Sequence, residues 1–475
     1  MSSGEFQALL PLMLLAGSAI AVMLAAAFHQ GHGTAVGVTL VGLGIVFASL
    51  FRVTPQQVGD LLSIDTYALF FIGLIVLVAL VVTVFSHGYL AKFHLKPEEY
   101  YMLLLLATLG SCILAASNHF ATFFLGLELL SVSLYVLIGY VFRRTTSMEA
   151  AVKYLILAAA SSAFLLFGMA LIYAELGSMS FGGLGVGFQE GIGGSKPAMI
   201  AGTVLMLTGI GFKLAVAPFH MWTPDIYQGA PAPVGAFVAT ASKGAMVALL
   251  FRFFGDFPVF RDNAVFTVFA VVAVASMTIG NLLALRQRNL KRILAYSSIA
   301  HLGYILVAFL AGGSRGLEAA TFYIVAYALA TLGAFGLIGA LATREGEPES
   351  VDDFTGLFWQ RPWLALVFSA SLLSLIGLPL TGGFWGKFLI VTAGVNSARW
   401  TLVILLVLNS AAGLYYYLRI LVAACRTPDL PSSLPALRFV DSALLGILAL
   451  LTFMLGVYPE PLLHLIRSLV MAGNS

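Results

Sequence analysis

Long apolar runs recur along the whole of this 475-residue chain. An α-helix needs about 20 such residues to cross the hydrocarbon core of a bilayer, where it also satisfies its own backbone hydrogen bonds. Charged residues make up only 9% of the chain, whereas a soluble domain carries about 25%. These patterns exclude an ordinary water-soluble domain and predict an all-α polytopic membrane protein.

The apolar runs predict about fourteen transmembrane helices within one domain, residues 1–475. The seventh and twelfth runs are longer than a bilayer requires, and proline and glycine interrupt both. Because proline removes a backbone donor and clashes with the preceding turn, we expect both helices to be broken. The longest polar connections are 177–197 and 344–361. The predicted spans are 5–28, 33–51, 65–87, 98–116, 118–142, 149–174, 198–226, 231–254, 263–285, 289–311, 316–343, 362–394, 399–424 and 440–466.

The order of the spans repeats along the chain. Spans four to eight, residues 98–254, have a break in their fourth member at Pro218, and spans nine to thirteen, residues 263–424, have one in their fourth member after Pro379. A unit with an odd number of spans must enter the membrane from the opposite side when it is repeated in tandem. The sequence therefore predicts two inverted five-helix repeats with broken helices seven and twelve.

Basic residues are more frequent in the loops on the side opposite the N-terminus, for example Arg143, Arg144, Arg286 and Arg288. Under the positive-inside rule these loops are cytoplasmic, which predicts that both termini lie on the outer side.

The chain lacks the patterns of a redox or nucleic-acid-binding protein. Its formal charge of +3 is too small to indicate a nucleic-acid partner. Its two cysteines, Cys112 and Cys425, lie in apolar runs and cannot hold an iron–sulfur cluster. No glycine-rich dinucleotide turn follows a predicted strand. We expect no cofactor in this chain.

Lys291 lies at the start of its predicted span and is counted with the loop charges, and four further lysines fall inside predicted spans: Lys153, Lys213, Lys243 and Lys387. A lysine at the bilayer centre costs about 2.5–3.5 kcal/mol, so such residues usually have a function. Snorkelling to the interface accounts most easily for Lys153, which is close to the start of its span, and less easily for all four.

Glu128 is the most isolated acid within a span and the natural partner of Lys213. Burial disfavours the charged form of either group, while proximity of the two favours both charged forms, so a pair that opens and closes acts as a proton switch. Lysine suits this role and arginine does not, because arginine stays charged. The alternative is a structural ion pair that pins a broken helix.

Further titratable residues lie near the two breaks. His220 follows Pro218 and titrates near neutrality, so it could relay protons or only hydrogen-bond the break. His301 lies in an apolar run of the second repeat. It could relay protons, or it could be a core histidine whose ring nitrogens are hydrogen-bonded. Lys387 follows the second break and is the candidate exit site. Lys243 is a relay or an interfacial snorkeller.

Four stretches resemble a known family: FLGLELLSVSLYVLIGY, GFKLAVAPFHMWTPDIYQGAPAPVGAFVATASK, NLKRILAYSSIAHLGY and GLPLTGGFWGKF. They look like the antiporter-like membrane subunits of the proton-pumping NADH:quinone oxidoreductase, respiratory complex I, and most strongly like its bacterial subunit-N branch. The resemblance extends from about Leu9 to Val470. It implies fourteen helices in two inverted units with broken helices seven and twelve.

The resemblance also implies roles for individual residues. Glu128 and Lys213 would form the charge-modulating pair, Lys243 would be the central lysine and Lys387 the distal one. The residues that the resemblance places on the proton path are Glu128, Lys153, Lys213, His220, Lys243 and Lys387.

The same resemblance implies a setting. NADH, FMN, iron–sulfur clusters and quinone are expected in partner subunits, and other membrane-arm subunits, the lipid bilayer and protons are the expected partners. The chain would act as a translocase subunit without a redox centre, in the bacterial inner membrane with both termini periplasmic.

Two other functions remain open at the level of the sequence. An Mrp-like cation/proton antiporter would share the fold, and Glu128 and Asp225 would then bind sodium. A purely structural spacer would use the buried charges only to pin broken helices. The lysines favour protons over sodium, because ammonium groups repel cations.

Overall fold

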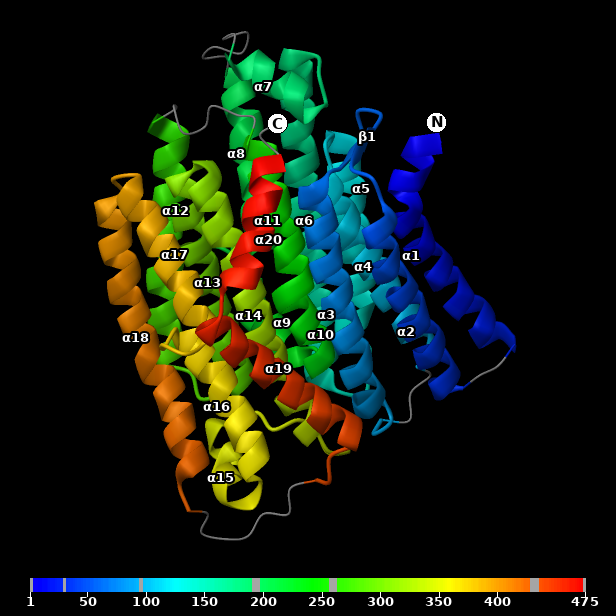
Figure 1. The fold of residues 1–475 in the computed structure, drawn as a ribbon, viewed down its shortest axis with the longest axis vertical. Helices are drawn as coiled ribbons and strands as arrows, with labels where there is room; N and C mark the ends of the chain where they lie inside the picture. Colours follow the sequence, from blue (N-terminus) through cyan, green and yellow to red (C-terminus); the bar gives the residue numbers. More distant parts are fainter. Residues whose placement is uncertain are drawn as a thin grey trace.

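Long apolar helices dominate the structure, a computed structural model that describes residues 3–28, 31–93, 97–189, 197–255, 263–427 and 435–472. Most of the helices run roughly along the long axis of the molecule (Figure 1). Within the described residues, thirteen helices are long and apolar enough to cross a membrane. The broken pair α16 and α17 adds one more span to these thirteen, so the expected fourteen spans are present.

The elements before the first break begin with α1 to α6, which cover Ser3–Phe28, His32–Ser49, Thr66–Leu90, Glu98–Ala116, Phe120–Ile138 and Thr145–Leu176. Between α2 and α3 lie a 3₁₀ turn and a hairpin, at Leu50–Arg52, β1 Gln56–Val58 and β2 Leu62–Ile64. The short helix α7 covers Phe181–Gln189.

The first broken span and its successor comprise α8 Pro197–Leu214, α9 Trp222–Gly229, α10 Ala232–Phe237, a π-helical turn Val238–Ser242 and α11 Lys243–Gly255. The second half comprises α12 Asn263–Leu285, α13 Leu290–Ala311, α14 Gly313–Leu341, a 3₁₀ turn Val351–Phe354, α15 Leu357–Gln360, α16 Pro362–Ile376, α17 Gly382–Asn396, α18 Trp400–Cys425, α19 Phe439–Val457 and α20 Glu460–Ala472.

Both predicted breaks are confirmed. In span seven, α8 ends at Leu214, and Ala215 adopts a left-handed conformation with φ 60° before α9 begins. In span twelve, α16 ends at Ile376, the next residue, Gly377, is left-handed with φ 86°, and Leu380 has φ 72° before α17 begins. Backbone groups freed at bilayer depth need partners. The Ser276 hydroxyl accepts the Ala217 N–H at 2.8 Å, which supplies one of them.

The two inverted repeats have corresponding members. The first contains α4, α5, α6, the broken pair α8–α9, and α10–α11. The second contains α12, α13, α14, the broken pair α16–α17, and α18. In each repeat the fourth span is therefore the broken one, as the sequence predicts.

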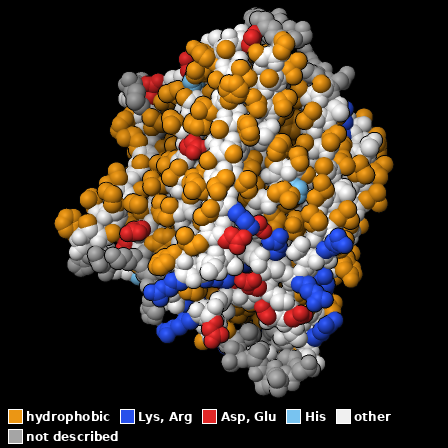
Figure 2. Space-filling model, turned by 180° about the vertical axis from the view of Figure 1, so that it is seen from behind, with side chains coloured by type: hydrophobic (Ala, Val, Ile, Leu, Met, Phe, Trp, Pro, Cys, Tyr) orange, Lys and Arg blue, Asp and Glu red, His pale blue; other side chains and the backbone are white. Residues whose placement is uncertain are grey.

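The burial of the helices is uneven, and it identifies the centre of the bundle. In the most apolar 18-residue stretches of Ala232–Gly255 and Leu290–Ala311, 94% of the residues are buried. In the corresponding stretch of Trp400–Cys425, 33% are buried. The surface seen in Figure 2 is mostly apolar, and Lys, Arg, Asp and Glu side chains gather toward the lower end. Both termini lie toward the upper end (Figure 1). This distribution fits a helix bundle with lipid around it and water at its ends.

The structure differs from the prediction in the last span, in the connections 177–197 and 344–361, the second of which contains α15, and between α2 and α3. Predicted span fourteen, residues 440–466, is two helices, α19 and α20, because Pro459 cannot continue the hydrogen bonding of α19. The connection 177–197 contains α7. The antiparallel hairpin of β1 and β2, in which Gln56 pairs with Ile64, was not predicted.

Candidate functional site

Lys213 lies at the end of α8, directly before the first break. Its side chain is buried, and its Nζ donates a hydrogen bond to the Ser131 Oγ at 2.6 Å. The ammonium also lies over the Tyr154 ring, 5.4 Å from its centroid, which is a cation–π distance. Because α8 ends one residue after Lys213, the contacts of the ammonium come from the neighbouring helices α5 and α6.

Glu128 lies on α5, one turn before Ser131 and on the same face of that helix. It accepts a hydrogen bond from the Ser162 hydroxyl of α6 at 2.5 Å. The ion pairs of the described residues include none between Glu128 and Lys213. The two predicted partners are therefore neighbours in a separated arrangement, and each is bonded to a serine.

Lys243 begins α11 directly after the π-helical turn and is only 1% exposed. Its Nζ donates to the Ser298 Oγ of α13 at 2.6 Å. The Tyr327 hydroxyl of α14 donates to the same oxygen at 2.8 Å, and the Tyr227 hydroxyl of α9 lies 3.3 Å from it. Four elements therefore converge on the Ser298 hydroxyl, deep inside the bundle. This position is not that of an interfacial snorkeller.

His301 lies one turn after Ser298 on α13, and phenols contact both of its ring nitrogens. Its Nδ1 is 2.6 Å from the Tyr323 hydroxyl, and its Nε2 is 3.2 Å from the Tyr417 hydroxyl. The Tyr327 ring is 5.2 Å from the imidazole ring. His301 is thus a hydrogen-bonded core histidine in the same polar cluster as Lys243.

Lys387 lies on α17, and its side chain reaches back to the second break. Its Nζ donates to the Ile376 carbonyl at the end of α16 at 2.7 Å and to the Ser410 Oγ of α18 at 2.8 Å. A cation at a helix C-terminus interacts favourably with the partial negative charge there. The ammonium also lies 5.2 Å from the centroid of the Tyr304 ring, and the His301 ring lies 5.5 Å from that same ring.

His220 lies on the segment between α8 and α9 and is 5% exposed. Its Nδ1 is buried without a hydrogen-bond partner among the described residues. Buried polar atoms usually have partners, so this exception is a candidate functional position. Among the described side chains, no hydrogen bond links Lys213 and Ser131 to Lys243 and Ser298. His220 lies in the segment that connects the two lysines in sequence.

Lys153 differs from the other three lysines of the predicted spans. Its side chain is 43% exposed, and its Nζ pairs with Glu149 at 2.6 Å and Asp225 at 2.9 Å. Asp225 also accepts a bond from the Arg292 guanidinium at 2.7 Å. The structure therefore places Lys153 in an accessible ion-pair cluster, outside the buried lysine groups.

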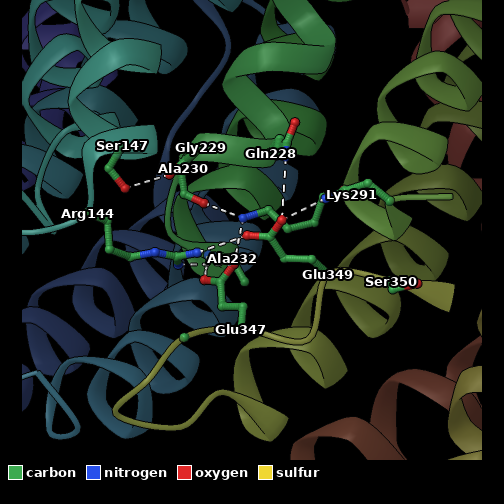
Figure 3. Close-up of polar contacts among 12 residues, drawn as sticks. Arg144, Ser147, Gln228, Gly229, Ala230, Ala232, Lys291, Glu347, Glu349 and Ser350 are labelled. Carbon is green, nitrogen blue, oxygen red and sulfur yellow. Dashed lines mark hydrogen bonds and ion pairs between the residues drawn. The ribbon is translucent and has the colours of Figure 1, made fainter. Parts of the chain in front are cut away.

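A second buried lysine cluster was missed by the sequence analysis. Lys291, in the first turn of α13, is fully buried, and its Nζ pairs with Glu347 Oε2 at 2.6 Å (Figure 3). The Arg144 guanidinium lies 3.8 Å from the same carboxylate and 3.1 Å from Glu349. Burial raises the pKa of Glu347, but the charge and hydrogen bond of Lys291, with Arg144, outweigh burial and lower that pKa overall.

This ion-pair cluster connects the two repeats. Lys291 also donates to the Ala230 carbonyl at 2.5 Å, and the Ala232 N–H donates to Glu347 Oε1 at 2.9 Å (Figure 3). Ala230 and Ala232 flank the turn between α9 and α10, whereas Lys291 and Glu347 belong to the second repeat and its connection. Among the described residues, no group of three His, Cys, Asp or Glu side chains is arranged to hold a metal ion.

Two inverted repeats, each with a broken helix and a lysine beside the break, are typical of transporter-like membrane domains. The family model described as "NADH:quinone oxidoreductase/Mrp antiporter, TM" matches residues 117–413 of this chain. The chain belongs to that family.

Three solved structures contain similar chains. A chain of respiratory complex I from Thermus thermophilus with bound aureothin has a TM-score of 0.82 and 33% identity, with 95% of this chain and 98% of that chain covered. A chain of the membrane-bound sulfane sulfur reductase, an archaeal respiratory membrane complex, has a TM-score of 0.85 and 25% identity over 98% and 97%. A chain of the Mrp complex from Dietzia sp. DQ12-45-1b has a TM-score of 0.86 and 21% identity over 98% and 97%, which shows a shared fold.

Proposed function

We propose that this chain is a proton-translocating membrane-arm subunit of an NADH:quinone oxidoreductase, in the position of subunit N. One observation supports this most directly: Lys213 and Lys243 are buried and Lys387 is partly buried, and among the described residues none of the three forms an ion pair with a carboxylate. A buried ammonium without a counter-charge gives up its proton more easily than a paired one. The chain therefore has three proton-carrying positions in its interior.

In the proposed cycle, Glu128 controls the first of these positions. When the Glu128 carboxylate approaches Lys213, it favours the ammonium form, and when it returns to Ser162 the ammonium loses that support. The released proton moves toward Lys243, with His220 on the connecting segment. From Lys243 it passes the hydroxyl-rich region around His301 to Lys387.

The charged end of the molecule supports the proposed orientation. The Lys and Arg side chains at the lower end in Figure 2 would face the cytoplasm under the positive-inside rule, with both termini periplasmic in a bacterial inner membrane. NADH oxidation, FMN, iron–sulfur clusters and quinone reduction belong to partner subunits in this proposal. Lys153 and Asp225, in their accessible cluster, would lie at the cytoplasmic end of the path.

Substitution of Lys213 by alanine tests the proposal. Membranes carrying Lys213→Ala are assayed for NADH:quinone activity and NADH-driven proton uptake, and NADH oxidation by an artificial acceptor verifies assembly. We expect loss of the first two activities with the third retained. Unchanged proton uptake would contradict the proposed switch and leave the structural-spacer function standing.

The Mrp-like cation/proton antiporter is the second candidate, and the shared fold with the Dietzia Mrp chain favours it. Asp225, one of the two acids suggested for sodium, is bonded to Lys153 and Arg292, which leaves it poorly suited to a cation. Sodium/proton exchange that fails in Lys213→Ala while NADH-driven pumping persists would favour the antiporter.

A further inference from the structure

The three interior lysines of the proposed path, Lys213, Lys243 and Lys387, share one kind of partner. Each ammonium donates a hydrogen bond to the hydroxyl of a serine on a neighbouring helix, and the distances are nearly equal. The pairs are Lys213 with Ser131 at 2.6 Å, Lys243 with Ser298 at 2.6 Å and Lys387 with Ser410 at 2.8 Å.

Lys291 shows that this fold can also bury a lysine differently. It is as buried as Lys243, but its partners are the Glu347 carboxylate at 2.6 Å and the Ala230 carbonyl at 2.5 Å. Both of those partners can only accept hydrogen bonds. Burial of an ammonium in this fold therefore does not require a serine partner. The lysines that have a serine partner are those of the proposed proton path.

A hydroxyl differs from a carboxylate or a carbonyl because it can both donate and accept. A lysine ammonium has three donors and no acceptor, so it can bond to any of these oxygens. After it loses a proton, the neutral amine has a lone pair that only a donor can fill. A serine hydroxyl can rotate and donate to that lone pair, whereas a carboxylate or a carbonyl cannot.

The contacts of Ser298 allow this rotation. Its oxygen accepts from Lys243 and from Tyr327, which uses both lone pairs, so its own proton is available to Tyr227 at 3.3 Å. When Lys243 releases a proton to the next carrier, one acceptor position of Ser298 becomes free. The hydroxyl proton can then turn from Tyr227 to the amine, and no atom of the serine is gained or lost.

Ser131 shows the same arrangement in the first repeat. Its hydroxyl donates to the Leu127 carbonyl one turn earlier at 2.5 Å while it accepts from Lys213. The proton that now points to the Leu127 carbonyl can point to the amine instead. A serine in a membrane helix commonly bonds to the carbonyl four residues earlier, so that bond is an ordinary alternative.

We propose that Ser131, Ser298 and Ser410 are positioning residues that hold their lysines in both protonation states by reversing the direction of one hydrogen bond. The proposal rests on the proposed function, because it assigns these serines to the same path. Their effect is on the proton transfer of the lysine and not on the stability of the bundle. Replacing a serine with a purely structural role would change the stability of the bundle and would leave the pH dependence of proton uptake unchanged.

Substitutions at Ser298 in the complete complex provide the test. Ser298→Ala removes the hydroxyl, and we expect about tenfold slower NADH-driven proton uptake, a changed pH profile of that uptake and normal NADH oxidation by an artificial acceptor. Ser298→Thr keeps the hydroxyl and should retain uptake within about twofold, with an unchanged pH profile. Ser298→Asp supplies a fixed acceptor and should abolish uptake.

Ser371→Ala is the matched control, because Ser371 is also buried and, among the described residues, bonds to the Val367 carbonyl and to no lysine. Uptake in Ser298→Ala that equals this control would overturn the proposal, as would a threonine variant as slow as the alanine variant. If Ser298→Thr fails to assemble, the same pair at the less buried Ser410 provides the comparison. Lys243→Ala separates the two hypotheses, since its normal uptake would contradict the proposed function itself.

Discussion

Lys291 and Lys243 are both buried, and each has an oxygen 2.6 Å from its ammonium, but the chemistry of that oxygen differs. Lys291 faces the carboxylate of Glu347, so two charges hold each other in the ionised form. Lys243 faces the neutral hydroxyl of Ser298, and no carboxylate of the described residues forms an ion pair with it. The comparison teaches that a partner's charge, and not depth of burial, separates a lysine that fastens two elements from one that can exchange a proton.

Arginine at each position gives the largest expected difference. Lys243→Arg should reduce NADH-driven proton uptake to background, because a guanidinium does not release its proton in a protein. Lys291→Arg should retain uptake, because Glu347 requires only a cation. Both variants are measured in membranes with assembly verified by NADH oxidation. Proton uptake that persists in Lys243→Arg would show that Lys243 does not carry protons.

Loss of the carboxylate should instead damage stability. Glu347→Gln leaves Lys291 buried without a counter-charge, which typically costs about 3–5 kcal/mol. Glu349→Gln is the control, because the Glu349 side chain is 37% exposed and such pairs are worth less than about 1 kcal/mol. Thermal unfolding of the purified complex in detergent measures both. Equal melting temperatures for the two variants would contradict the assignment of Lys291 to a fastening role.

The same ion pair predicts an acid sensitivity. The pKa of Glu347 is lowered from its ordinary value of 4.5, so its contribution to stability is complete above about pH 4.5 and is lost as the pH falls through the lower pKa of the folded protein. The advantage of the wild-type protein over Glu347→Gln should therefore be constant from pH 5 to 7 and shrink at lower pH. Melting temperatures measured across this range test the sign, and an advantage that grows on acidification would refute it.

Lys153→Ala should have the smallest effect. Because its side chain is exposed, its ion pairs with Glu149 and Asp225 should contribute less than about 1 kcal/mol to stability. We also expect a smaller loss of proton uptake than in Lys243→Arg. A loss as large as that of Lys243→Arg would place Lys153 on the same internal path as the buried lysines.

The fold could be predicted because its main signals are local. Apolar runs fix the spans, and the proline and glycine residues near Pro218 and Gly377 fix both breaks. The division of the last span into α19 and α20 also has a local signal, Pro459, which the apolar run on both sides obscured. The hairpin of β1 and β2 depends on strands of three residues, which are too short to give a periodic pattern.

The partners of the site residues could not be predicted, because they are distant in sequence. Lys213 and Ser131 are 82 positions apart, and Lys243 and Ser298 are 55 apart, so only the packing of helices brings them together. Lys291 looked like a loop charge because it begins its span. The acids of the connection 344–361 were the one available signal for its partner Glu347.

The π-helical turn Val238–Ser242 has a consequence for how this gene can change in length. A π turn accommodates one residue more than an α turn, and each residue of an α-helix advances by about 100° around the axis. Lys243 therefore faces Ser298 because of how many residues precede it in that span. A single-codon deletion within the turn would restore regular α geometry and leave Lys243 facing Ser298, because the π turn absorbs that one residue. A second deletion would rotate the ammonium about a quarter of a circle away, so this turn should tolerate the loss of one residue but not of two.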